Sequence, residues 1–140
     1  MADNRPDGRV NGTGSVSCSY IRRIVGTDRL NMNMYIERIG QGPDLVLLHG
    51  FMENLLIWEE MENYLSKDFT LIKIDLPGHG LSKIYNEIHT MELMAQEVRK
   101  VTDHLKIGNF HLLGHSMGGY ASLAFAEKFP ETLKSLTLFF

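Results

Sequence analysis

The chain has 140 residues, of which 44% are hydrophobic and 22% charged, and its formal net charge is −3. One cysteine, Cys18, excludes an intramolecular disulfide, and no stretch approaches the ~20 consecutive apolar residues of a bilayer-spanning helix. A slightly negative net charge does not indicate the basic surface on which nucleic-acid binding usually depends, so nucleic-acid binding is not predicted. No basic segment followed by an apolar one opens the sequence, so no secretory signal is predicted and a cytoplasmic location is expected.

The predicted elements alternate between strands and helices along the chain. Residues 1–17 are polar and glycine-rich, which predicts a disordered tail ahead of a domain at 18–140. Apolar residues two apart predict a strand hairpin, and short apolar runs predict four buried strands; these ranges are 18–27 with 31–39, then 44–49, 69–75, 109–113 and 133–140. Helical spacing predicts helices at 54–65, 90–106 and 117–129. The order predicts an α/β fold, a mostly parallel sheet with helices on both faces.

One turn between a predicted strand and helix fits the pattern G-x-S-x-G. It is GHSMGG at 114–119, and a strand that turns sharply into a helix at this pattern exposes the serine hydroxyl at the carboxyl end of the sheet. Glycines two residues before and after Ser116 remove side chains that would collide in so tight a turn. The helix N-terminus there favours developing negative charge. The alternative is a glycine-rich turn in which Ser116 only caps the helix.

A second turn follows the first buried strand, with the sequence HGF at 49–51. This position donates a second oxyanion amide in comparable folds, so the backbone N–H groups of Phe51 and Met117 are predicted to converge on a substrate carbonyl. The loop DLPGHGLS at 75–82 closes the next strand and is expected to shape the site. The residues predicted to shape the elbow and the HGF turn are Gly114, His115, Gly118, Gly119, His49 and Gly50.

These three motifs, in this order and spacing, resemble the α/β-hydrolase superfamily over roughly residues 20–140. The resemblance implies that Ser116 is a nucleophile, that Phe51 and Met117 are the oxyanion donors, and that no cofactor is needed. A serine at a position where related dehalogenases and epoxide hydrolases carry aspartate favours acyl chemistry, the hydrolysis of a carboxylic ester or a related small-molecule acyl substrate through an acyl-enzyme. Carbon–carbon bond hydrolases and cofactor-free haloperoxidases share similar motifs and stay open as alternatives.

The sequence departs from the family pattern after the elbow. The triad order in this fold is serine, acid, histidine, but the residues after Ser116 include Glu127 and Glu131 and no aspartate or histidine. The acid and the base are therefore not expected in this chain. The chain is interpreted as the N-terminal part of a hydrolase about twice as long, through about strand six, or as one piece that a C-terminal half complements. Alone it is predicted to be inactive; a catalytically silent binding module is the non-enzyme alternative.

Two other chemistries are less consistent with the sequence. His111 and His115 are four residues apart, but on a strand this spacing separates them by roughly 13 Å, too far for one metal ion. Asp75 and His79 could approach each other, but no third ligand is evident, so no metal site is predicted. No G-x-G-x-x-G follows the first strand, and no Gly-Lys-Ser/Thr of a P-loop is present, so nucleotide binding is not predicted.

Overall fold

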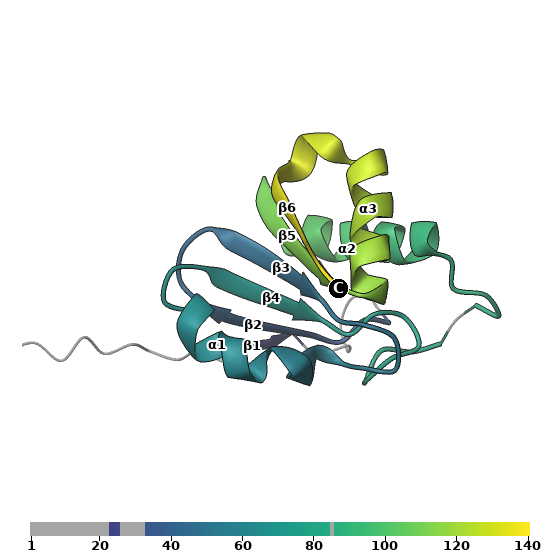
Figure 1. Ribbon diagram of the computed structural model, residues 1–140, viewed down its shortest axis with the longest axis horizontal. Coiled ribbons are helices and arrows are strands. Elements are labelled where there is room, and N and C mark those ends of the chain that lie inside the picture. The colour runs from purple at the N-terminus through teal and green to yellow at the C-terminus, as the bar shows by residue number, and fades with distance from the viewer. Residues whose placement is uncertain (1–22, 26–32, 85) are drawn as a thin grey trace, which may run out of the picture.

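The computed structural model describes residues 23–25, 33–84 and 86–140 (Figure 1). The tail expected at 1–17, Cys18 and most of the first predicted strand lie outside these residues. The elements are β1 (Arg23–Val25), β2 (Ile36–Gly40), β3 (Asp44–Leu48), the 3-10 helix η1 (Leu55–Trp58), α1 (Glu59–Leu65), β4 (Thr70–Ile74), α2 (Met91–His104), β5 (Phe110–His115), α3 (Met117–Lys128), the 3-10 helix η2 (Pro130–Thr132) and β6 (Leu133–Phe139).

The strands form one six-stranded sheet in the order β1-β2-β4-β3-β5-β6. The four strands β4, β3, β5 and β6 are mutually parallel. The predicted hairpin is confirmed where it can be seen, because β1 pairs antiparallel with β2 and β2 pairs antiparallel with β4. The prediction of a mostly parallel sheet is therefore confirmed. Parallel pairing also brings the carboxyl ends of β3, β4 and β5 to one edge of the sheet, where the predicted motifs begin.

Helices cover both faces of the sheet, as the alternation predicted (Figure 1). Side chains of β3 alternate between the two faces. Leu45 and Leu47 pack in one buried cluster with Trp58, next to α1. Val46 and Leu48 belong to the larger cluster on the other face, which also takes residues of α2 and α3 such as Val98, Ala121 and Phe125. The continuous apolar run of β3 thus follows from burial on both faces.

Two predictions need correction, one of a helix start and one of the burial of a strand. The predicted helix 54–65 begins as the 3-10 helix η1, with Asn54 as its N-cap, and becomes α-helical only at Glu59. The strand 133–140 was predicted to be buried, yet β6 is largely exposed, with Phe139 62% exposed. Its position explains the difference, because β6 is the end strand of the described sheet and pairs only with β5.

A buried lysine in β4 was not predicted. The side chain of Lys73 is fully buried, and its Nζ lies 2.8 Å from Oε2 of Glu37 and also contacts the carboxylate of Glu62 on α1. Burial acts to lower the pKa of Lys73, but the hydrogen bonds to the two carboxylates outweigh it and raise that pKa above its ordinary value. A charged cluster is therefore enclosed between the sheet and α1.

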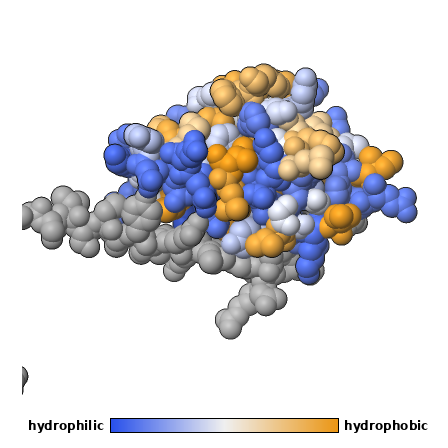
Figure 2. All heavy atoms as spheres, turned by 60° about the horizontal axis from the view of Figure 1, so that its bottom comes forward, coloured by the Kyte–Doolittle hydropathy of each residue, from blue (hydrophilic) through white to orange (hydrophobic). Residues whose placement is uncertain are grey.

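The surface of the described residues is mixed in character. Figure 2 shows one face on which small hydrophobic groups are separated by hydrophilic residues. Leu56, Ile57 and Tyr64 are among the exposed large apolar side chains, and such scattered apolar exposure is ordinary for a folded domain. Among the helices that the structure describes, none has the length and apolar character to cross a membrane.

Candidate active site

Ser116 occupies the turn between β5 and α3 in a backbone conformation that L-residues rarely adopt. Its φ is 50° and its ψ is −114°, and such conformations cost about 1–3 kcal/mol each. The Ser116 N–H donates to the carbonyl of Phe139, at 2.8 Å, and the Ser116 carbonyl accepts from the N–H of Gly119, also at 2.8 Å. Strand β6 and the first turn of α3 therefore hold the strained residue in place.

The glycines around Ser116 are required because α3 lies close to the strand ends. A Cβ on Gly118 would lie 2.5 Å from the carbonyl oxygen of Leu48, and a Cβ on Gly114 would collide with the Gly118 carbonyl and the Ser122 hydroxyl. At Gly119 a Cβ would come within 3.1 Å of the ring of Phe140. The first turn of α3 can approach β3 and β5 only because residues 114 and 118 have no side chain, whereas at residue 119 a small shift of the Phe140 ring would make room.

The Ser116 side chain lies at the start of α3. It is half-buried at the N-cap position of α3, but among the described residues its hydroxyl makes no capping hydrogen bond. Met117 is the first residue of α3, and the first amides of a helix have no intrahelical acceptor. The geometry thus places a hydroxyl and a helix N-terminus together, at the carboxyl end of the parallel strands.

The HGF turn is held by the buried imidazole of His49. Since a carbonyl only accepts, Nδ1 of His49 donates to the carbonyl of Gly50 at 2.8 Å, and Nε2 accepts from the N–H of Leu76 at 2.9 Å. The N–H of Glu53 also donates to the Gly50 carbonyl, at 3.3 Å. The described peptide bonds include no cis bond, so the Phe51 N–H points away from that carbonyl. The orientation of the Phe51 amide is thereby fixed.

Acidification is expected to destabilise the fold through His49. Burial is the largest cause of its lowered pKa, which lies below the ordinary value of 6.5. As the pH drops below about 6.5, the His49 imidazole is protonated in the unfolded chain before it is protonated in the folded chain. The free energy of unfolding therefore falls over this range. Urea unfolding at pH 5 to 7.5 should show a pH dependence that is weaker in His49→Asn. Parallel pH profiles for the two proteins would contradict the assignment.

Glu53 is a site residue that sequence reasoning missed. Its Oε2 accepts from the N–H of Gly50, at 2.6 Å, and lies 3.0 Å from Nδ1 of His115. Burial acts to raise the pKa of Glu53, but the hydrogen bonds from Gly50 and His115 together lower it below its ordinary value. The position of Glu53, three residues after Gly50, could have suggested a turn acceptor. No sequence signal connects it with His115, 62 residues away.

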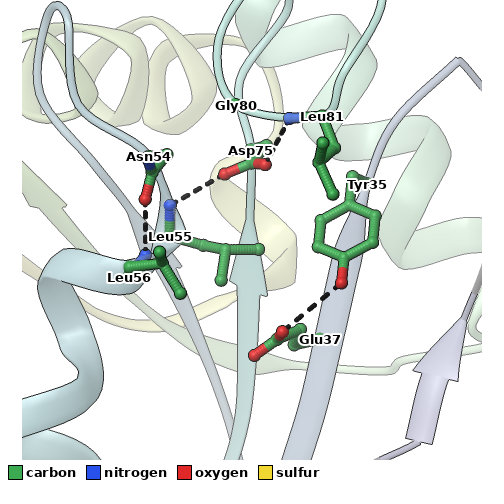
Figure 3. Close-up of a pocket in the computed structure, with 8 residues that line it drawn as sticks. All are labelled: Tyr35, Glu37, Asn54, Leu55, Leu56, Asp75, Gly80 and Leu81. Atoms are coloured by element: carbon green, nitrogen blue, oxygen red, sulfur yellow. Dashed lines mark hydrogen bonds between the residues drawn. The ribbon is translucent and has the colours of Figure 1, made fainter.

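The loop after β4 is organised around the buried carboxylate of Asp75 (Figure 3). Its two oxygens accept from the N–H of Leu55, at 2.7 Å, and from the N–H of Leu81, at 2.8 Å. A Cβ on Gly80, whose φ is +53°, would collide with this carboxylate. Asp75 therefore joins the start of η1 to the loop 75–82, and both oxygens are used in backbone contacts.

A cavity of about 380 Å³ lies beside this loop (Figure 3). It is lined by Tyr35, Glu37, Asn54, Leu55, Leu56, Asp75, Gly80 and Leu81. Ser116, Phe51 and Met117 are not among these residues, so the candidate nucleophile and the predicted oxyanion donors do not line this cavity. The histidines considered as metal ligands have other partners: His111 bonds to Ser135 and His115 to Glu53. Over the described residues, no group of three or more His, Cys, Asp or Glu side chains could hold a metal ion.

Comparisons with known proteins agree with the fold. The model of the alpha/beta hydrolase fold family matches residues 43–139. A pimeloyl-[acyl-carrier protein] methyl ester esterase of Aeromonas hydrophila is 38% identical over 106 residues, which cover 75% of this chain and 40% of that protein. A fluoroacetate dehalogenase of a Burkholderia species is 31% identical over 124 residues, covering 85% of this chain and 40% of that protein.

A thermophilic esterase from Thermogutta terrifontis has a similar solved structure. Its TM-score is 0.73 at 36% identity, over 75% of this chain and 39% of the esterase. The chain thus spans about 40% of the length of the curated relatives named above. Most of the chain, including the HGF turn and the elbow, lies inside the matched region. The family match and the mostly parallel sheet together show that this chain belongs to the α/β-hydrolase fold family.

Proposed function

We propose that this chain carries the nucleophile and the oxyanion hole of a serine hydrolase that cleaves carboxylic esters through an acyl-enzyme. The observation that carries the proposal is the strained turn at Ser116, with its φ of 50° between β5 and α3. Strain of this kind persists where the surrounding structure over-determines it, and it is concentrated at functional sites. The named esterase relatives support an ester as the substrate. The Ser116 oxygen would attack the ester carbonyl carbon while a general base takes the hydroxyl proton, which gives a tetrahedral intermediate. Breakage of the bond to the alcohol oxygen, which receives that proton, releases the alcohol and leaves the acyl-enzyme, and water then hydrolyses the acyl-enzyme to the carboxylic acid.

Two backbone amides would stabilise the oxyanion of that reaction. The Phe51 N–H is oriented by the contacts of the Gly50 carbonyl with His49 and Glu53, and the Met117 N–H lies in the first turn of α3. Preorganised donors of this kind typically contribute about 2.7–4 kcal/mol each to transition-state stabilisation. We assign the 75–82 loop a shaping role, because the carboxylate of Asp75 is occupied by two backbone amides.

The general base and its acid would come from outside these 140 residues. No histidine and no aspartate follow Ser116 in the sequence, whereas the serine of this fold depends on both. We therefore propose that further polypeptide, in the same protein or as a complementing C-terminal half, supplies them. Without the base, the Ser116 hydroxyl is an unactivated nucleophile.

Labelling with a fluorophosphonate probe tests this proposal. The protein expressed from its complete coding sequence is expected to be labelled at Ser116, as located by peptide mass spectrometry, and Ser116→Ala should abolish the label. The 140-residue chain alone should be neither labelled nor active on a p-nitrophenyl ester, since it lacks the base. A folded complete protein that takes no label would refute the proposal and favour the silent binding module. Turnover by the short chain that Ser116→Ala removes would refute the need for an outside base.

A further inference from the structure

Two segments carry the proposed oxyanion donors, and one carboxylate joins them. The HGF turn holds Phe51 and the elbow holds Met117, while Oε2 of Glu53 accepts from Gly50 in the first and contacts His115 in the second. Gly50 directly precedes Phe51, and His115 lies two residues before Met117. A single acceptor atom therefore spans the gap between two strand ends.

The surroundings of this contact favour a defined geometry. The side chains of Glu53 and His115 are 32% and 24% exposed, so the contact is partly screened from water. A hydrogen bond to a charged group is shorter and stronger than a neutral one, and the distance from Gly50 N to Oε2 is only 2.6 Å. The His115 ring also packs on Phe139, with ring centroids 5.4 Å apart. The lowered pKa of Glu53 keeps the carboxylate ionised, as an acceptor only.

We propose that Glu53 and His115 are a pair of positioning residues that couple the HGF turn to the nucleophile elbow and so set the spacing of the Phe51 and Met117 amides. The proposal rests on the proposed function for its catalytic consequence, but the coupling itself is a property of the backbone. Neither side chain reacts with substrate. Their effect is on how well two amides match a developing oxyanion, a match in which small displacements are costly.

Kinetics of the complete protein give the first test, with variants Glu53→Ala, Glu53→Gln, His115→Phe and Glu53→Ala/His115→Phe. The phenyl ring preserves the contact with Phe139 and removes the nitrogen. Each alanine or phenylalanine variant should lower kcat for a p-nitrophenyl ester about tenfold with KM nearly unchanged, a part of the effect of losing one donor. Glu53→Gln, which can still accept from Gly50, should lose less.

The double variant should be no worse than the worse single variant, because both remove one interaction. Glu60→Ala, which removes an exposed carboxylate on α1, is the matched control and should resemble the unmodified protein. Additive losses in kcat, or a loss confined to KM, would overturn the proposal. Equal unfolding midpoints would separate positioning from simple destabilisation.

Hydrogen exchange of the Gly50 amide, followed by NMR, is the readout that does not depend on activity. Exchange should become about tenfold faster in both Glu53→Ala and His115→Phe, and stay unchanged in Glu60→Ala, because weakening one side of a shared contact weakens the other. If exchange responds while the unmodified protein hydrolyses no ester, the proposed function fails and the coupling stands. If His115→Phe leaves Gly50 exchange unchanged, the coupling is wrong whatever the activity.

Discussion

Replacing Ser116 by glycine is expected to abolish ester hydrolysis by the complete protein and, at the same time, to make the fold more stable by about 1 kcal/mol. The serine holds a φ of 50° and a ψ of −114°, where a Cβ causes strain and glycine has none. The backbone strain that is relieved, about 1–3 kcal/mol, exceeds the free-energy cost of the greater conformational entropy of glycine in the unfolded chain, about 0.5–1 kcal/mol. Loss of the nucleophile should cost about 10⁴-fold or more in kcat.

Denaturant unfolding beside ester hydrolysis checks both parts of this prediction. Ser116→Ala is the matched control, because it removes the hydroxyl and keeps the Cβ. It should be as inactive as the glycine variant and close to the unmodified protein in unfolding free energy. A glycine variant less stable than the alanine variant would show that the turn is not strained. Full activity in either variant would exclude Ser116 as the nucleophile.

Replacing Lys73 by alanine is expected to lower the free energy of unfolding by about 3–5 kcal/mol, the usual cost of breaking a buried ion pair on one side. The variant leaves the carboxylate of Glu37 buried, and that of Glu62 on α1 nearly so, without the cation that lies between them. Because the pKa of Lys73 is raised, its stabilising contribution is present below the ordinary value of 10.5 and is lost only as the pH rises through the higher folded value.

Urea unfolding of two further variants identifies the cause. Lys134→Ala removes an exposed lysine from β6 and should change the unfolding free energy by less than about 0.5 kcal/mol. The triple variant Lys73→Met/Glu37→Gln/Glu62→Gln removes the whole charge cluster and should be more stable than Lys73→Ala, since no unpaired charge stays buried. A triple variant no more stable than the single one would show that packing, not charge, dominates at this position.

Local patterns were sufficient to predict the parts of the fold that local physics decides. The apolar run of β3 is readable from neighbouring residues, and so is the start of the predicted helix 90–106, where the Thr90 hydroxyl accepts from the Leu93 N–H. The turn at Ser116 was found because its glycines are within two residues of it. Strand β6 was misjudged for the opposite reason: an apolar sequence such as LKSLTLFF is buried only when other elements cover it.

What the sequence could not reveal are contacts between residues far apart in the chain. The partners of Lys73 lie 36 residues before it and 11 residues before it, on a different strand and a helix. Glu53 and His115 are separated by 62 residues. A lysine in a hydrophobic run, such as Lys73, does not indicate its partner in the sequence, and neither does a residue beside a motif, such as His115. The partners become known only when the topology brings the elements together.

The close approach of α3 to β3 also limits how this protein can change over time. A methyl group at residue 118 would overlap the backbone of Leu48 and His49, whereas one at Gly108 would meet open space. Substitutions can therefore accumulate at 108 without moving anything, while any side chain at 118 has to push a whole helix away from the sheet. Natural and directed evolution can therefore change residues away from this contact, while glycine at residue 118 has to stay.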